Sequence, residues 1–225
     1  MGYDAVLLDN DGIITRMTDR AVLARAVRGA FRDLGVRDPD PADVDALVVG
    51  VTPELLEEIA GRYDLDPAEF WYRRDLRSSM VQIRELRSGK KALYDDVAAL
   101  ADIPLPMGIV SSNQHRTIEA ILEHYDLQDR FGTYYGREMD PASLARKKPA
   151  THYLDLAVAD LGASEPIFVG DSESDIQAAA AAGMDSVFVR RDHRDGFDLA
   201  VSPTYEIASL SELPRILNGD PRPTH

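Results

Sequence analysis

The feature that most constrains the fold is a set of five short apolar runs that alternate with stretches of helical character. The runs lie at residues 5–8, 107–110, 133–135, 167–169 and 186–189, the third being the weakest. Uninterrupted apolar runs of this length are typical of parallel strands that are buried on both faces. Helical patterns occupy residues 94–101, 114–124, 151–161 and 176–182. The alternation predicts an α/β fold with a doubly wound, Rossmann-like parallel sheet, in which ligands bind at the carboxyl ends of the strands.

The stretch after the first run has no strand-like pattern and contains several helix-start signals. A capping Asp or Thr directly precedes a proline at Asp40, Thr52 and Asp66, which is the arrangement preferred at the first turn of a helix. We therefore expect an inserted α-helical cap, which would serve as a lid at the ligand end of the sheet. The expected division is a core at residues 1–16 and 88–217, a cap at residues 17–87 and a flexible tail at residues 218–225.

The sequence is strongly acidic, with 39 Asp and Glu, 25 Lys and Arg, and a formal net charge of -14. Because no basic stripe appears, we expect no nucleic-acid partner. Only four basic residues are lysines; this balance indicates adaptation to high salt or an ordinary acidic protein, and we favour the halophilic interpretation. The absence of cysteine excludes disulfides and thiolate catalysis. No apolar run approaches about 18 residues, so we expect a soluble, cytoplasmic protein with no membrane span.

Two carboxylates, Asp9 and Asp11, follow the first apolar run. Side chains two residues apart on extended backbone point to the same side, and Gly12 allows a sharp exit from the strand. Carboxylates that converge in a cleft repel each other unless a cation or a proton lies between them. The alternative is an acidic surface turn. A calcium-binding EF-hand loop is excluded because Arg20 stands where that loop has its twelfth-position glutamate.

The fourth apolar run also ends in carboxylates. Asp171 would lie at the end of the strand and Asp175 in the first turn of the next helix. Oxygen ligands from the tips of two strands are the ligands that Mg²⁺ prefers. The simpler alternative is that these residues only cap the alanine-rich helix that follows.

Two further segments carry groups that suit a phosphate. Ser111, Ser112 and Asn113 follow the second run, where a hydroxyl group and free backbone N–H groups at a helix start would hold phosphate oxygens. Lys147 and Lys148 precede a proline, and a lysine there would neutralise both a phosphate and a carboxylate. A routine N-cap and a solvated basic turn are the respective alternatives.

These four segments, taken together and in this order, resemble the haloacid dehalogenase superfamily, and within it the helical-cap phosphatases such as phosphoglycolate phosphatase. The family pattern is Asp-x-Asp-Gly, then a strand-end Ser or Thr, then Lys-Pro, then Gly-Asp-x-x-x-Asp. The resemblance spans roughly residues 4–192. Ile13 stands where the family usually has Thr or Val, and we expect this difference to tune the loop without loss of chemistry.

The resemblance implies a role for each of these residues. Asp9 looks like the nucleophile that becomes an aspartyl-phosphate, and Asp11 like the general acid that later activates water. Mg²⁺ would be held by Asp9, the backbone carbonyl of Asp11, and Asp171, with Asp175 closing or supporting the shell. The phosphate would be held by Ser111, Ser112, Asn113 and Lys148, with Lys147 as the substitute if the register shifts by one residue.

The expected function is that of a Mg²⁺-dependent phosphatase acting on a small phosphorylated metabolite, with phosphoglycolate as the first candidate by family analogy. A haloacid dehalogenase would need neither Asp11 nor a metal, whereas a phosphomutase would need a lid that retains a bisphosphate. A non-enzymatic phospho-acceptor of the receiver type would need an aspartate at the end of the third run, where residues 133–136 offer none. The candidates in the cap to face the cleft are Arg62, Tyr63, Trp71 and Arg74, and the alternative for each is an ordinary surface or core position.

Overall fold

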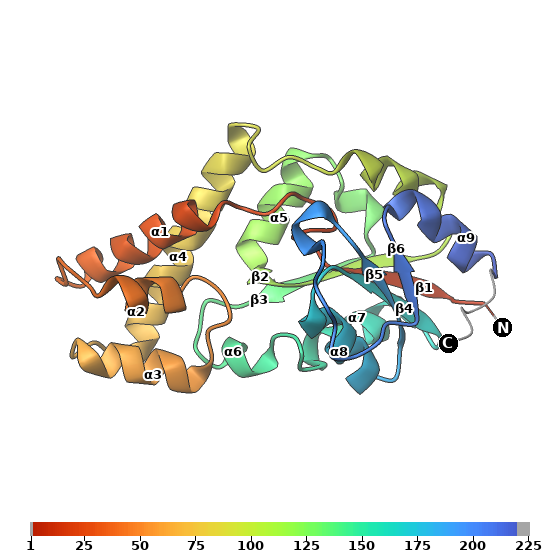
Figure 1. Cartoon of the computed structure of the whole chain (residues 1–225). Coiled ribbons are helices and arrows are strands. Elements are labelled where there is room, and N and C mark those ends of the chain that lie inside the picture. Colours follow the sequence, from red (N-terminus) through yellow and green to blue (C-terminus); the bar gives the residue numbers. More distant parts are fainter. Residues whose placement is uncertain (1, 220–225) are drawn as a thin grey trace.

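The computed structural model describes residues 2–219, and its core is a six-stranded parallel sheet with the strand order β3-β2-β1-β4-β5-β6 (Figure 1). The strands are β1 (Ala5–Leu8), β2 (Met107–Gln114), β3 (Thr133–Arg137), β4 (Pro166–Gly170), β5 (Asp185–Val189) and β6 (Tyr205–Ile207). The predicted α/β class and Rossmann-like parallel sheet are confirmed. The sequence pattern does not predict β6, a three-residue strand at the edge of the sheet.

Successive residues of β1 pack on opposite faces of the sheet. Val6 and Leu8 belong to a core cluster that includes residues of α5 (His115–His124) and α9 (Leu213–Leu217). Leu7 belongs to another cluster, on the face covered by α7 (His152–Leu161) and α8 (Glu173–Ala181). All four residues of β1 are fully buried, which explains why the run is apolar at every position.

Three of the four helices expected in the core are present, with boundaries within three residues of the prediction. They are α5, α7 and α8. The helix expected at 94–101 is instead a 3₁₀ helix, η1 (Asp95–Asp102). Four short elements complete the core: η2 (Gln128–Arg130), α6 (Ser143–Arg146), η3 (Asp192–Arg194) and η4 (Leu210–Glu212).

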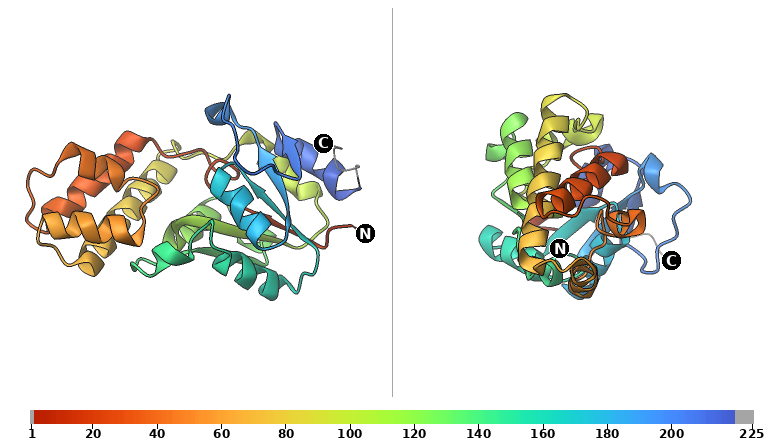
Figure 2. Two further views of the ribbon diagram at one scale, coloured as in Figure 1. Left: turned by 60° about the horizontal axis from the view of Figure 1, so that its bottom comes forward. Right: turned by 90° about the vertical axis from the view of Figure 1, so that its left-hand side faces the viewer.

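Four helices lie between β1 and β2 in the chain: α1 (Arg20–Asp33), α2 (Pro41–Ala46), α3 (Pro53–Arg62) and α4 (Pro67–Arg87). The expected helix N-caps are formed, because Asp40, Thr52 and Asp66 each accept a hydrogen bond from a backbone N–H in the first turn of their helix. These helices bury an apolar cluster centred on Phe31 and Phe70. They lie to one side of the sheet and are joined to it by two chain segments (Figure 2).

The carboxyl-terminal end of the chain is described only in part. Of the flexible tail predicted at residues 218–225, Asn218 and Gly219 follow α9, and the rest lies outside the described residues. Within residues 2–219, no helix has the length and apolar character needed to cross a bilayer.

Candidate active site

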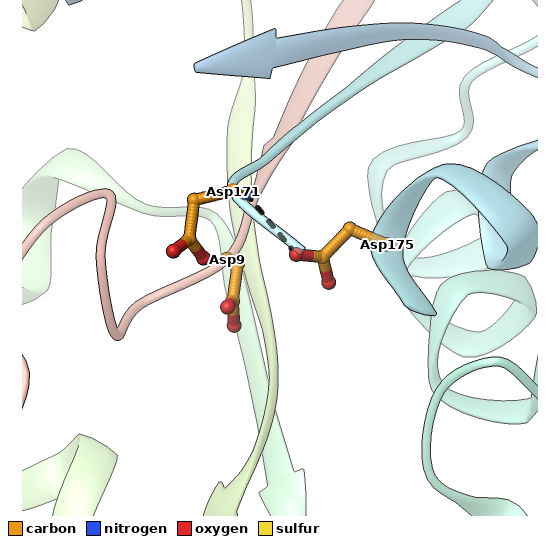
Figure 3. Close-up of side chains that lie close together, drawn as sticks. All are labelled: Asp9, Asp171 and Asp175. Atoms are coloured by element: carbon orange, nitrogen blue, oxygen red, sulfur yellow. Dashed lines mark hydrogen bonds between the residues drawn. The ribbon is translucent and has the colours of Figure 1, made fainter. Parts of the chain in front are cut away.

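The ends of β1 and β4 bring three aspartates together. These strands are neighbours with Leu8 opposite Val169, so Asp9 and Asp171 leave the sheet side by side (Figure 3). Asp175 reaches the same place from the first turn of α8. One carboxylate oxygen from each residue lies within 4.8 Å of the other two, and all three residues are buried.

Two glycines make room for this cluster. A side chain on Gly12, whose φ is +88°, would place its Cβ 2.4 Å from Cγ of Asp171. A Cβ on Gly170 would lie 2.3 Å from Cβ of Asp175. Both contacts are far shorter than van der Waals distance, so the close approach of the carboxylates requires glycine at both positions. Ile13, the departure from the family pattern, is fully buried in the main core.

Lys148 supplies positive charge beneath the cluster. Its ammonium group lies 2.9 Å from Oδ1 of Asp9 and 2.6 Å from Oδ1 of Asp175, and it donates a hydrogen bond to the carbonyl of Val110 at 3.0 Å. One ammonium group neutralises only part of the charge of three converging carboxylates. The number and type of their oxygens fit a hard divalent cation.

The burial of these charges shifts their pKa values. Burial raises the pKa of Asp9 to about 7, against the opposing charge of Lys148, and the carboxylates of Asp175 and Asp171 add to the rise. Burial alone would lower the pKa of Lys148, but Asp175 and Asp9 outweigh it and raise that pKa above its ordinary value. Asp171 has partners of its own, because its Oδ2 lies 2.7 Å from Nε2 of His193 and 3.2 Å from Nε of Arg194.

Asp11 is held by a lysine that sequence analysis did not assign to the site. The ammonium group of Lys91, which is 1% exposed, forms an ion pair with Asp11. The side-chain amide of Asn113 donates to the other oxygen of Asp11 at 2.8 Å. Burial would raise the pKa of Asp11, but Lys91 and these hydrogen bonds hold it below its ordinary value. The sequence signal for Lys91 is only that it is one of four lysines.

A cavity of about 210 Å³ opens between the core and the inserted helices. Of the predicted site residues, Asp9, Asp11, Ser111, Ser112 and Asn113 line it. The hydroxyl oxygen of Ser111 is buried and accepts a hydrogen bond from the backbone N–H of Asn113 at 3.2 Å. The remaining predicted residues, Lys148, Asp171 and Asp175, are buried beside Asp9 rather than along the cavity wall.

The inserted helices contribute the opposite wall. Two of the four candidate cap residues, Trp71 and Arg74, line the cavity. Arg62 and Tyr63 do not, because both bind the carboxylate of Asp43 within the helical insertion.

Further cavity residues come from segments to which the sequence assigns no primary role in the site. Gln82 of α4 exchanges hydrogen bonds with the amide of Asn113, at 2.8 Å and 3.0 Å. Arg137 at the end of β3 and Lys147 after α6 also line the cavity; of these two, only Lys147 was noticed in the sequence. Neither Gln82 nor Arg137 belongs to a motif, so no local signal identifies them.

The family model for haloacid dehalogenase-like hydrolases matches residues 6–189. A phosphoglycolate phosphatase of Photorhabdus laumondii is 26% identical over 216 residues, spanning 93% of this chain and 87% of its own length. A phosphoglycolate phosphatase of Pseudomonas fluorescens is 31% identical over 217 residues, spanning 92% of this chain and 77% of its own length.

Solved structures share the fold. CbbY from Rhodobacter sphaeroides in complex with phosphate has a TM-score of 0.69 and 18% identity, with 94% of this chain and 96% of that chain covered. A structure described as a phosphoglycolate phosphatase from Lactobacillus plantarum has a TM-score of 0.68 and 19% identity, with 96% of this chain and all of that chain covered. The family match covers most of the sequence and its relatives are phosphatases, so this chain belongs to the haloacid dehalogenase-like hydrolases and is a phosphatase acting on phosphoric monoesters.

Proposed function

We propose that this phosphatase is Mg²⁺-dependent and transfers the phosphoryl group of a small phosphorylated metabolite to Asp9. The observation that carries the proposal is the approach of Asp9, Asp171 and Asp175 to within 4.8 Å of one another. The same three residues, with the backbone carbonyl of Asp11, would hold the ion. Bound there, Mg²⁺ would neutralise charge on the nucleophile and on the phosphoryl group.

The protein groups act in two displacements. In the first, a carboxylate oxygen of Asp9 bonds to phosphorus while the bond from phosphorus to the ester oxygen breaks, and Asp11 gives its proton to the departing alkoxide. In the second, Asp11 takes a proton from water and the water oxygen bonds to phosphorus. The bond from phosphorus to the Asp9 oxygen breaks, which releases inorganic phosphate and restores the carboxylate of Asp9. Lys148 and the hydroxyl of Ser111 would hold the phosphoryl oxygens throughout.

Asp11 must therefore change partners during turnover. In the described arrangement, Lys91 and Asn113 favour its ionised form, which is the form that accepts a proton from water. The first displacement needs the protonated form, so we expect substrate binding to move Asp11 away from Lys91.

We further propose that residues 17–87 form a cap and that phosphoglycolate is the substrate. Trp71 and Arg74 of α4 line the same cavity as Asp9, so movement of the cap would open and close the site. The phosphoglycolate phosphatases among the relatives support the substrate, and the cavity of about 210 Å³ suits a small molecule.

Phosphate release from p-nitrophenyl phosphate and from phosphoglycolate tests the proposal. With Mg²⁺ present, Asp9→Asn should lower kcat by about 10⁴-fold or more, because an amide cannot serve as the nucleophile. Circular dichroism should show that the variant is folded. The matched control is Asp129→Asn, an exposed aspartate in η2 outside the cavity, which should retain full activity.

Removal of the metal is the second arm of this test. Excess EDTA should abolish phosphate release, and added Mg²⁺ should restore it. Wild-type turnover in EDTA, or full activity of Asp9→Asn, would contradict the proposed mechanism.

A further inference from the structure

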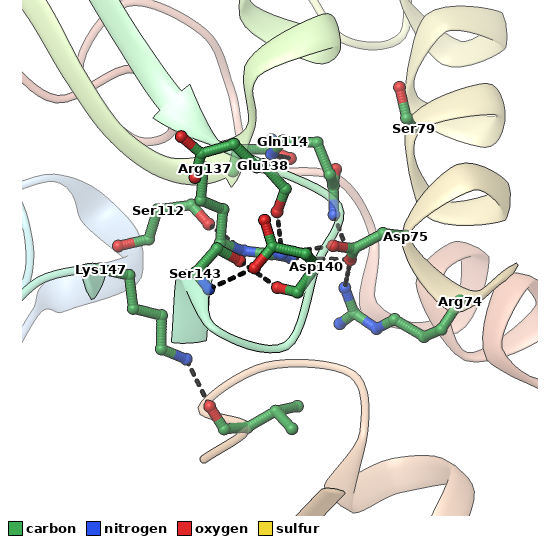
Figure 4. Close-up of polar contacts among 12 residues, drawn as sticks. Arg74, Asp75, Ser79, Ser112, Gln114, Arg137, Glu138, Asp140, Ser143 and Lys147 are labelled. Carbon is green, nitrogen blue, oxygen red and sulfur yellow. Dashed lines mark hydrogen bonds and ion pairs between the residues drawn. The ribbon is translucent and has the colours of Figure 1, made fainter. Parts of the chain in front are cut away.

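Three cations line the cavity wall, and two of them pair with a single carboxylate. Arg74 of α4, Arg137 at the end of β3, and Lys147 after α6 all line the cavity that contains Asp9. Among the described residues, Asp75 is the one acidic side chain that this group contacts, and it is completely buried (Figure 4). The group therefore carries more positive than negative charge.

The carboxylate of Asp75 is fully used by its neighbours. Its Oδ1 accepts hydrogen bonds from Arg74 at 2.8 Å, from Arg137 at 2.7 Å and from the Gln114 amide at 2.9 Å. Its Oδ2 forms an ion pair with Arg137. Both oxygens are therefore committed to the two arginines and the amide, and neither forms an ion pair with Lys147.

Lys147 has only a neutral partner among the described residues. Its ammonium group donates to the backbone carbonyl of Val51 at 2.6 Å. The acidic residues that precede α6 are engaged elsewhere, because Glu138 and Asp140 both pair with Arg146. Within residues 2–219, no carboxylate lies within 4.0 Å of the Lys147 ammonium group.

The surroundings of Lys147 disfavour its charge. Burial lowers the pKa of Lys147 to about 8, and the nearby positive charges of Arg137 and Arg74 lower it further, against the opposing effect of Asp75. An anion in the cavity would reverse this balance, since it would give the ammonium group the opposite charge that the protein does not provide.

We propose that Lys147, supported by Arg74 and Arg137, binds a second anionic group of the substrate. This inference rests on the proposed phosphatase function and narrows the substrate class to small phosphate esters that also carry a carboxylate or a second phosphate. The reacting phosphate would lie at Asp9 and the second anion at Lys147, because both residues line one small cavity. Lys147 is then a specificity-determining residue, distinct from Lys148, which contacts Asp9.

Two matched pairs of compounds test this subsite. Phosphoglycolate is compared with 2-hydroxyethyl phosphate, which replaces the carboxylate by a neutral alcohol. Propane-1,3-diol bisphosphate is compared with 3-hydroxypropyl phosphate, which lacks the second phosphate. In at least one pair, the wild type should show a kcat/KM about tenfold or more higher for the compound that carries a second anionic group. The pair that shows it identifies the second anion as a carboxylate or a phosphate.

Variants at position 147 locate the preference. Lys147→Met should bring the ratio of the two kcat/KM values within each pair to about threefold or less. The main cause should be a higher KM for the compound with two anionic groups, with little change for the compound that has only the phosphate. Lys147→Arg should retain much of the preference because it keeps the charge. Arg146→Gln is the matched control: this neighbouring cation pairs with Glu138 and Asp140 outside the cavity, so the ratio should stay at the wild-type value.

Three outcomes would overturn the inference. These are equal kcat/KM for both members of both pairs in the wild type, an equal loss on all compounds in Lys147→Met, and loss of the preference in Arg146→Gln. In each case the chain remains an active phosphatase. Failure of the wild type to hydrolyse any of the four compounds or p-nitrophenyl phosphate would instead reject the proposed function, and this inference with it.

Discussion

A lysine that the protein holds partly out of water without an acidic partner lowers the stability of the folded state. The charged groups that act on Lys147 are Arg74 and Asp75 of α4 and Arg137 at the end of β3. The neutral carbonyl of Val51 accepts its hydrogen bond. Its pKa of about 8 in the folded protein lies below the ordinary lysine value of 10.5. The folded state therefore binds this proton less tightly than the unfolded state does.

The sign of the resulting pH dependence follows from proton linkage. Below pH 8 both states carry the charge, and the folded state bears the full desolvation penalty. Between pH 8 and pH 10.5, the unfolded chain retains a proton that the folded protein has released, so rising pH removes the penalty and adds stability.

Lys147→Met should therefore be more stable than the wild type at neutral pH. We expect its free energy of unfolding to be higher by about 1–2 kcal/mol at pH 7, after allowance for solvent screening and the lost hydrogen bond. Roughly half of this advantage or less should remain at about pH 9.5. Urea unfolding of both proteins at several pH values measures the difference in the free energy of unfolding. A difference that grows with pH would show that the pKa of Lys147 is not lowered in the folded protein.

At the scale of elements, Lys91 joins the two chain segments that connect the inserted helices to the sheet. It follows α4, and its ammonium group contacts Asp11 and donates to the carbonyl of Arg16 at 3.2 Å and to the hydroxyl of Thr18 at 3.4 Å. The two segments also meet directly, since the backbone N–H of Arg16 donates to the carbonyl of Ala92 at 2.8 Å. One buried side chain thus holds the proposed acid and both connections.

Replacement of Lys91 by methionine should disturb both Asp11 and the junction of the two connecting segments. It removes the cation from a largely buried carboxylate, so we expect the free energy of unfolding to fall by about 2 kcal/mol. The matched control is Lys90→Met: Lys90 is exposed and pairs only loosely with Glu85 at 3.9 Å, so its effect should stay within about 0.5 kcal/mol. Equal stability of the two variants, measured by urea unfolding, would show that Lys91 does not anchor this junction.

The elements that sequence analysis predicted are those whose burial is continuous. The run at residues 5–8 is apolar throughout because helices cover both faces of β1. β6 has no such signal: it is an edge strand of three residues, with exposed Glu206 between Tyr205 and Ile207. The 3₁₀ geometry of η1 also has no separate signature, because its apolar spacing resembles that of an α-helix.

The sequence pattern predicts the parts of the site that lie at strand ends, but it carries no signal for the contacts made across the insertion. Asp9 and Asp171 could be placed together because parallel strands end at one edge of the sheet. Lys91 lies 80 residues from Asp11, and Gln82 meets Asn113 only because α4 packs beside the core. Such contacts depend on how the insertion is oriented, which no local pattern specifies.

At the scale of the whole molecule, the site must bind anions within a strongly acidic chain. The formal net charge is -14, and charges separated by more than about 10 Å are largely screened at ordinary salt concentrations. Local cations therefore matter more than the global charge, and Lys148 and Lys147 are two of only four lysines in the sequence. The halophilic interpretation of the composition stays a prediction.

We propose that segments distant in the sequence fold into one cation site. Isothermal titration calorimetry with Mg²⁺ is the decisive experiment, in which the wild type is compared with Asp171→Asn and with the exposed control Asp129→Asn. We expect about one Mg²⁺ to bind to the wild type and to the control, and the affinity of Asp171→Asn to be at least about tenfold lower, because one of the three converging carboxylates is lost. Equal affinity of all three proteins for Mg²⁺ would contradict it.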